Sequence, residues 1–295
     1  MRLGVVILPE FPWSVARGVW RRAEELGFDH AWTYDHLAWR PLRDSPWFGA
    51  VPILTAAALV TERIRLGILV ASPNFRHPVP FARELITLDD VSGGRFTLGI
   101  GAGSARSDAT ILGQAPWSPR ERADRFEEFV ALTDRLLREP ATSYSGRFYS
   151  AIEARTYPGC VQRPRIPFAI AATGPRGMRL AARLADVWVT TGEPQSDRLL
   201  PAEQGARLVH EQMERLDQAC AALGRAPASL RRLVLTGPSL DGGLASPAMF
   251  QDTIGRYAAA GVTDFVVHWP RPDGPYAGDV ETFERIVSAV DHPGG

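Results

Sequence analysis

The chain has 295 residues, 45% of them hydrophobic, and its 33 basic and 33 acidic side chains balance to a net charge of zero. Without a basic surplus or a block of like charges, neither nucleic acid nor an acidic membrane surface is an expected partner. No apolar run approaches the roughly 20 residues that span a membrane, and the first residues have the pattern of a strand. Neither a transmembrane helix nor a signal peptide is therefore expected.

The 33 basic residues are all arginine, and the chain contains no lysine. A Schiff-base lysine is thus excluded, and with it class I aldolases and pyridoxal-phosphate enzymes. The lysine of a Walker A motif is excluded as well. Cys160 and Cys220 are too few for a disulfide framework and have no CxxC spacing, which favours a reducing, cytoplasmic location.

Apolar strand-like runs alternate with helix-like segments along the chain. The predicted strands cover residues 3–8, 28–33, 64–70, 96–100, 168–171, 187–190, 230–235 and 265–268. The predicted helices cover residues 14–26, a segment ending near 61, 78–91, 119–137, 175–184, 202–223, 247–260 and 280–290. The segments 103–117 and 143–167 are expected to be loops.

Eight strands alternating with eight helices predict an α/β fold, a (β/α)8 TIM barrel with short insertion loops. No linker interrupts the alternation, so residues 1–295 are expected to form a single barrel domain. A doubly wound sheet is the alternative. That fold usually carries its glycine fingerprint after the first strand, where this chain has the segment Pro9-Glu10-Phe11-Pro12.

Two helix starts carry clear signals. Pro78 stands where a helix tolerates proline, in its first turn. Ser118 is predicted to cap the next helix, with Pro119 at the first helical position and Glu121 completing a capping box. The buried stripe of that helix is predicted to be Phe126, Phe129, Val130, Leu136 and Leu137.

In a (β/α)8 barrel the active site lies at the carboxyl ends of the strands. Asp35 and His36 follow the second strand, and a carboxylate beside an imidazole suits acid/base chemistry near neutral pH. The alternative is that Asp35 caps the loop and His36 packs against Trp39.

The third and fourth strands form one βαβ unit that ends in glycines. Leu69-Val70-Ala71-Ser72-Pro73 is either an ordinary turn or a ligand clamp. Gly99, Gly101 and Gly103 are expected to let a ligand approach the backbone. Tight packing at the barrel rim is the alternative for these glycines.

The fifth predicted strand leads into Ala172-Thr173-Gly174-Pro175-Arg176. Free amides at this helix start favour an anion such as phosphate, and Arg176 would add a charge-assisted contact. An ordinary capped helix is the alternative. A rival phosphate seat is Thr236-Gly237-Pro238, because many barrels bind phosphate after strands seven and eight.

Three of the six histidines, His36, His77 and His268, fall near strand ends. Three histidines on one face would suit a metal ion. The chain has no HxH motif and few carboxylates at the other strand ends, so no metal site is expected.

Four segments of the chain carry a family resemblance. They are GFDHAWTYDHL, RIRLGILVASPNFRHPVPFARELITLDDVSGGRFTLGIGAG, YSGRFYS and IPFAIAATGPRGMRLAARLADVWVTTG, which span most of residues 1–192 in order. Together they resemble the luciferase-like monooxygenase superfamily and, within it, the oxidoreductases that depend on the deazaflavin coenzyme F420. The last hundred residues match no motif of that family.

The resemblance implies roles for the residues after the second and third strands. Asp35 and His36 would lie near the redox-active ring, with His36 as the acid/base. Leu69 and Val70 would be joined by a non-prolyl cis peptide behind the ring. Ser72 would hydrogen-bond the cofactor.

The resemblance also implies contacts farther along the cofactor. Gly103, Ser104 and Ser107 match the loop beside the ribityl chain. Thr173 and Gly174, next to Ala172, match the pair along the ribityl-phosphate. The resemblance therefore favours a phosphate site at Thr173-Gly174 over the one at Gly237. Trp39 resembles a tryptophan at the substrate pocket, and the aromatic residues in the loops suggest a flat or apolar substrate: Trp39, Trp47, Phe48 and Trp117.

The function that the resemblance implies is hydride transfer between F420 and a small organic substrate. An FMN-dependent monooxygenase on the same barrel is the alternative. From other classes, a metal-assisted hydrolase or isomerase and a non-catalytic flavin-binding protein also remain. The lysines that hold a sugar phosphate in the glucose-6-phosphate dehydrogenase relatives are absent, so that substrate is not expected. Relatives are commonly dimers, and a homodimer is expected.

Overall fold

The computed structural model describes residues 1–103, 108–193 and 198–290. Within these ranges, eight strands pair in the closed order β1-β10-β9-β8-β7-β4-β3-β2. Their bounds are β1 Arg2–Val6, β2 His30–Thr33, β3 Arg65–Ala71, β4 Phe96–Ile100, β7 Phe168–Ala171, β8 Val187–Thr190, β9 Arg231–Leu235 and β10 Asp264–His268. The predicted (β/α)8 barrel is thereby confirmed.

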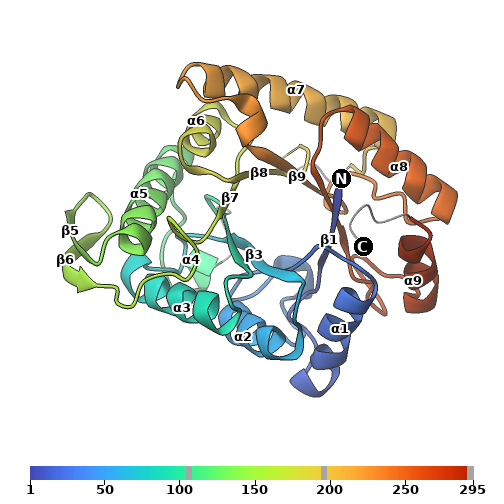
Figure 1. Cartoon of the computed structure of the whole chain (residues 1–295), viewed down its shortest axis with the longest axis horizontal. Helices are drawn as coiled ribbons and strands as arrows, with labels where there is room; N and C mark the ends of the chain where they lie inside the picture. Colours follow the sequence, from blue (N-terminus) through green and yellow to red (C-terminus); the bar gives the residue numbers. More distant parts are fainter. Residues whose placement is uncertain (104–107, 194–197, 291–295) are drawn as a thin grey trace. The chain divides into compact units, whose positions relative to one another are not determined.

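Helices follow the strands in the predicted alternation (Figure 1). Their bounds are α1 Trp13–Glu25, α2 Ala50–Val60, α3 Pro78–Val91, α4 Asp108–Ile111, α5 Pro119–Arg138, α6 Pro175–Leu184, α7 Ala202–Ala221, α8 Pro247–Ala259 and α9 Val280–Ser288. Two short 3-10 turns lie at Arg40–Leu42 and Pro227–Ser229. None of the helices among the described residues is both long and apolar enough to cross a membrane.

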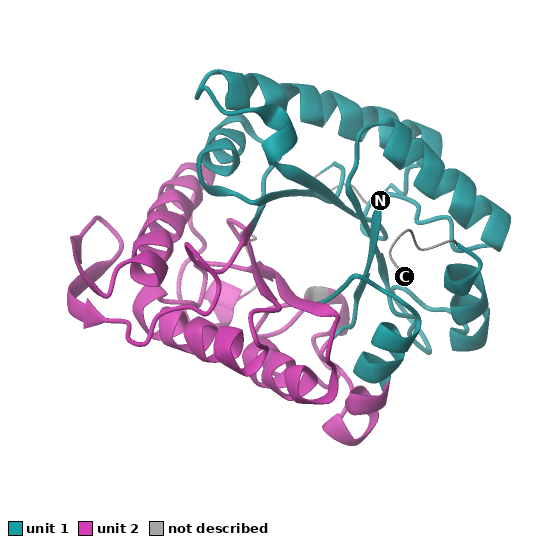
Figure 2. Ribbon diagram, in the orientation of Figure 1, with its two compact units in different colours: residues 1–8, 19–32, 169–295 teal, residues 9–18, 33–168 magenta. Residues whose placement is uncertain are grey.

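The chain forms two compact units (Figure 2). Unit 1 comprises residues 1–8, 19–32 and 169–295, and unit 2 comprises residues 9–18 and 33–168. The expectation of a single domain over residues 1–295 stays a prediction.

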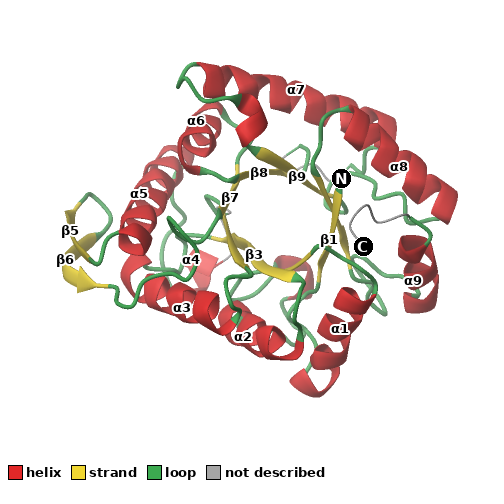
Figure 3. Cartoon of the chain, viewed as in Figure 1, coloured by secondary structure: helices red, strands yellow, loops and turns green. Residues whose placement is uncertain are grey.

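Unit 1 is built on parallel strands in register. In β1, Val5 faces Val267 of β10 on one side and Ala31 of β2 on the other. Every residue of β2, β8 and β10 is buried, as expected for strands of a parallel sheet. Helix α6 packs against α7, α7 against α8, and α8 against α9, and α7 and α8 run along the outer side of their strands (Figure 3).

Unit 2 pairs β3 with β4, where Ile68 faces Leu98, and packs α3 against both α2 and α5. Helix α5 begins as predicted, with Ser118 as N-cap, Pro119 at the first position and a complete capping box with Glu121. The whole predicted stripe of α5 is buried.

Two predicted loops contain regular structure. Residues 143–167 include most of an antiparallel hairpin of β5 (Ala141–Ser145) and β6 (Ser150–Arg155). Its tip is fixed by Glu128, whose carboxylate accepts hydrogen bonds from three consecutive backbone amides. The single turn α4 lies within residues 103–117. Both elements were missed because they bury too few side chains to show a periodic pattern.

A buried ionic network ties the starts of three strands of unit 1 together. Asp264 at the start of β10 is ion-paired with Arg231 of β9, and its Oδ1 lies 3.1 Å from His30 Nε2 of β2. His30 Nδ1 accepts a hydrogen bond from Trp32 Nε1 at 2.7 Å. Gly4 leaves room for this imidazole, since a Cβ there would overlap the ring.

Candidate active site

In unit 2, His36, which follows β2, forms an imidazole–carboxylate pair with Asp108 of α4. His36 Nδ1 lies 3.0 Å from Asp108 Oδ2, and Asp108 Oδ1 accepts a hydrogen bond from Leu37 N at 2.8 Å. The Asp108 side chain is 1% exposed and that of His36 is 24% exposed. A carboxylate can only accept, so Nδ1 carries the proton and Nε2 is left as the acceptor. No described residue hydrogen-bonds Nε2.

Asp35, the sequence neighbour of His36, has a different partner. Its carboxylate receives two hydrogen bonds from Arg76, from Nε at 3.0 Å and from Nη2 at 2.8 Å. Arg76 also bonds Glu84 and lies over the rings of Phe75 and Phe81. A bidentate pair with an arginine fixes both oxygens of this buried carboxylate, so the geometry favours an anchoring role for Asp35.

Two of the predicted aromatic residues, Trp39 and Trp47, gather around His36. Trp47 Nε1 donates to the backbone oxygen of His36 at 2.9 Å, and the Trp39 and Trp47 rings lie 6.1 Å apart. Tyr34 contacts both Trp39 and His36 edge-on. Trp117 packs elsewhere, against Phe148 and the guanidinium of Arg125.

The end of β3 and the turn that follows it confirm one prediction and support another. The peptide bond between Leu69 and Val70 is cis, as expected. Ser72 is buried, and its hydroxyl has no hydrogen-bond partner among the described residues. Leaving a buried hydroxyl unpaired costs about 1–3 kcal/mol, which marks this oxygen as a group that a ligand would satisfy.

The glycines at the end of β4 divide into two kinds. A Cβ on Gly99 would overlap the carbonyl oxygen of Ile68, so Gly99 serves packing between β3 and β4. The expectation that a ligand approaches Gly99 is wrong for this reason. Gly103 has φ +73°, and a Cβ there would lie 2.6 Å from Asn74 Nδ2. The predicted contacts Ser104 and Ser107 lie outside the described residues.

In unit 1, the start of α6 has the form expected for an anion site. Gly174 is the N-cap without a side-chain hydrogen bond, Pro175 is the first helical residue, and the space beside Gly174 is open. The backbone oxygen of Ala172 accepts from Trp188 Nε1 at 2.6 Å. Thr173 and Arg176 flank this start and are partly exposed.

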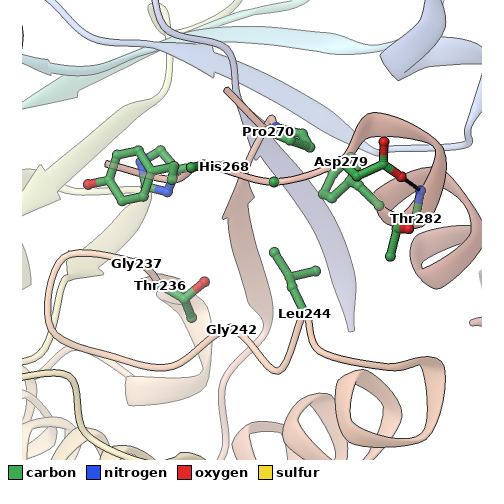
Figure 4. Close-up of a pocket in the computed structure, with 12 residues that line it drawn as sticks. Thr236, Gly237, Gly242, Leu244, His268, Pro270, Asp279 and Thr282 are labelled. Atoms are coloured by element: carbon green, nitrogen blue, oxygen red, sulfur yellow. Dashed lines mark hydrogen bonds between the residues drawn. The ribbon is translucent and has the colours of Figure 1, made fainter. Parts of the chain in front are cut away.

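A cavity of about 160 Å³ opens in unit 1 where β9 and β10 end (Figure 4). Pro270 and Phe283 are buried in its wall, and Ala277 and Asp279 are exposed at its rim. The rings of His268 and Tyr276 stack with centroids 3.5 Å apart and planes at 11°. The sequence pattern had indicated a possible phosphate seat at Thr236-Gly237-Pro238 and a possible metal ligand in His268.

Gly237 makes room for the stacked rings of this cavity. Its φ is +103°, and a Cβ would lie 2.8 Å from both His268 Nδ1 and Tyr276 Cε1. Burial lowers the pKa of His268 to about 3, so the imidazole is neutral at physiological pH. The carboxylate of Asp279 caps α9 by accepting from Thr282 N at 2.7 Å.

His77, the other histidine of unit 2, is bonded within the fold and lies against an aromatic ring. His77 caps α3 by accepting from Val79 N, and its ring meets Tyr149 edge-on. The described part of the chain contains no group of three or more His, Cys, Asp or Glu side chains arranged to hold a metal ion.

Comparisons with known proteins agree on one family. The model of the luciferase-like monooxygenase family matches residues 1–241. The F420-dependent glucose-6-phosphate dehydrogenase of Microbacterium testaceum is 35% identical over 194 residues, which cover 61% of this chain and 54% of that protein. The chain thus spans about half the length of the curated relatives it matches.

Solved structures share the fold at lower identity. The coenzyme F420 dependent tetrahydromethanopterin reductase from Methanopyrus kandleri aligns with a TM-score of 0.76 at 19% identity, over 97% of both chains. The monooxygenase RslO1 from Streptomyces bottropensis aligns with a TM-score of 0.76 at 21% identity, over 97% of this chain and 96% of that one. Because a reductase and a monooxygenase share it, the fold does not choose between these activities.

Proposed function

Because this chain belongs to the luciferase-like monooxygenase family, we propose that it is an oxidoreductase that transfers a hydride between coenzyme F420 and a small organic substrate. The named F420-dependent relatives support the cofactor. The observation that carries the activity is the His36–Asp108 pair, which leaves one imidazole nitrogen available for a proton.

The residues of unit 2 fit the cofactor at the position that the resemblance assigns to it. Ser72 presents a buried hydroxyl that no described group satisfies, and a polar edge of the ring system would satisfy it. Asn74 leaves no room for a side chain at position 103. Gly103 therefore keeps the backbone after β4 uncovered. Leu69 and Val70 belong to the same proposed contact surface.

His36 is the proposed acid/base. When bound, the deazaflavin ring supplies the site that donates or accepts the hydride. His36 Nε2 holds or receives the proton that accompanies hydride transfer, while Asp108 fixes the ring through Nδ1. The partly exposed side chain of His36 lets this proton exchange with solvent.

Asp35 acts as an anchor in this proposal. Its bidentate pair with Arg76 holds the loop that carries His36, and loss of Arg76 would leave a buried charge uncompensated. Trp39 and Trp47 enclose the His36 side of the site and are proposed to border the substrate.

The start of α6 is the proposed seat of the cofactor phosphate. An uncapped helix N-terminus with a glycine and open space beside it suits an anion. Thr173, Gly174 and Arg176 are the proposed contacts, and Ala172 leads into them. Their assignment rests on the resemblance together with this helix geometry.

A turnover assay tests the proposed activity. The protein is reconstituted with oxidised or reduced F420 and mixed anaerobically with neutral alcohols, aldehydes, ketones and a sugar phosphate while deazaflavin fluorescence is recorded. We expect a substrate-dependent change of cofactor oxidation state that His36→Ala suppresses. Substrate-dependent oxygen consumption with FMN, and no change with F420, would instead support the monooxygenase.

Two further expectations follow from the resemblance. A homodimer is proposed, and light scattering on the purified chain gives its molecular mass directly. A cytoplasmic location is proposed from the two unpaired cysteines, which are both buried.

A further inference from the structure

We propose that the cavity at the ends of β9 and β10 binds a small, uncharged molecule with a flat apolar body and disfavours phosphate esters. The binding does not depend on the proposed function.

The size of the cavity limits the ligand. Its volume is about 160 Å³. An apolar cavity of about 150 Å³ accommodates a benzene-sized molecule. A hexose phosphate is considerably larger, so the cavity alone would not enclose it.

The walls of the cavity are flat and apolar. Tyr276 stacks on His268, and both residues line the cavity. Phe283 adds apolar surface, as do Leu244 and Pro270 (Figure 4). A stacked aromatic wall favours a flat ligand.

The loop that carries this wall is held in place. Arg271 is buried and donates from Nη1 to the backbone oxygens of Asp273 and Pro275 at 2.6 and 3.2 Å. Its backbone N–H bonds the oxygen of Tyr276 at 3.0 Å. The site is therefore formed before a ligand arrives, which lowers the entropic cost of binding.

The one charge in the described cavity lining is negative and opposes an anion. Among the described lining residues, the one charged side chain is Asp279. This carboxylate caps α9 by accepting from Thr282 N, so a negative charge already occupies the helix end where an anion would bind. His268 adds no positive charge because it is neutral. The rule that barrels bind phosphate after strands seven and eight is therefore not expected to hold here.

A matched pair of probes tests the proposal on the cofactor-free protein. Fluorine NMR follows titration with para-fluorobenzyl alcohol and with para-fluorobenzyl phosphate, which share one apolar body and differ in charge. We expect the alcohol to bind at least tenfold more tightly. Equal or tighter binding of the phosphate ester would overturn the proposal.

Variants locate the binding. Ala277→Phe fills the rim and is expected to weaken alcohol binding at least tenfold, and Leu244→Trp should do the same from the opposite loop. Ala248→Phe is the matched control, because Ala248 is also an exposed alanine and does not line the cavity. Unfolding curves verify that each variant is folded. Unchanged binding in both folded cavity variants would overturn the proposed location.

Asp279→Asn tests the charge argument. Asparagine is as good an N-cap as aspartate, so α9 keeps its start. We expect the affinity for the phosphate ester to rise about threefold to tenfold, while the affinity for the alcohol stays unchanged. An unchanged preference for the alcohol would refute the role of Asp279. F420 is absent from these titrations, so their outcome is independent of whether the proposed function holds.

Discussion

Two imidazole–carboxylate pairs in this chain have nearly the same length and very different surroundings. His30 Nε2 lies 3.1 Å from Asp264 Oδ1, and His36 Nδ1 lies 3.0 Å from Asp108 Oδ2. Around His30, Trp32 occupies the second ring nitrogen and Arg231 shares the carboxylate. Around His36, no described residue bonds the second nitrogen. Both ring nitrogens of His30 are used by residues of the fold. His36 keeps its second nitrogen, Nε2, for acid/base chemistry.

Both histidines belong to the same strand region, and their places explain the difference. His30 is the first residue of β2, and His36 follows the last residue of β2 by three positions. In a (β/α)8 barrel, the amino ends of the strands serve stability and the carboxyl ends carry catalysis. We therefore expect substitutions of the two histidines to separate stability from activity.

The largest effect is expected for His36→Ala. Removal of a general acid/base lowers kcat by roughly 10²–10⁴-fold. The free energy of unfolding should fall by only about 1 kcal/mol, because buried Asp108 loses His36 but keeps the hydrogen bond from Leu37 N. Steady-state kinetics and denaturant unfolding on the same preparation measure both quantities. Near-wild-type kcat would remove His36 from the acid/base role.

His30→Ala should show the opposite pattern. The substitution leaves Asp264 with Arg231 as its remaining charged partner, takes the acceptor from Trp32 and opens a cavity beside Gly4. We expect a loss of about 2–4 kcal/mol in the free energy of unfolding. Turnover per folded molecule should be unchanged. A large fall in turnover at full stability would contradict the division between the two pairs.

Asp108→Asn sharpens the account of the second pair. Asparagine keeps the size of the side chain but can present an N–H instead of an oxygen to His36 Nδ1, which allows the wrong tautomer. We expect kcat to fall about 10- to 100-fold with little change in KM. Asp35→Asn is the comparison, and it should act chiefly on stability because its partner is Arg76. An equal fall in kcat for both variants would show that the two carboxylates do not differ in role.

At neutral pH the smallest effect concerns a third histidine, His268. Its pKa is lowered by burial to about 3, below the ordinary value of 6.5. Between these two pH values the unfolded chain binds a proton that the folded chain does not, so the free energy of unfolding falls as the pH falls. The slope from this group is at most about 1.4 kcal/mol per pH unit. The His268→Gln variant should lack that contribution, and an identical pH dependence in both proteins would argue against a neutral buried His268.

The barrel strands were predictable because strands buried on both faces are continuous apolar runs. The residues of β4, β7 and β8 were predicted without error. Proline and glycine marked the helix starts, as at Pro119 and Pro175. The hairpin of β5 and β6 was missed because it exposes much of both strands, so its sequence has no buried face to detect.

The site was only partly predictable. Asp35 and His36 are adjacent in sequence, yet each pairs with a different distant residue, Asp35 with Arg76 and His36 with Asp108. Asp108 lies 72 residues from His36, and no local pattern links them. The stacked pair of His268 and Tyr276 depends on the left-handed backbone of Gly237, which a sequence pattern does not reveal.

The central claim is that this chain uses F420, and an equilibrium titration with F420 and with FMN tests it most directly. We predict tight binding of F420, weaker binding of FMN, no bound metal, and a Ser72→Ala variant that loses about threefold to tenfold in F420 affinity. Tight binding of FMN without binding of F420 would contradict the claim.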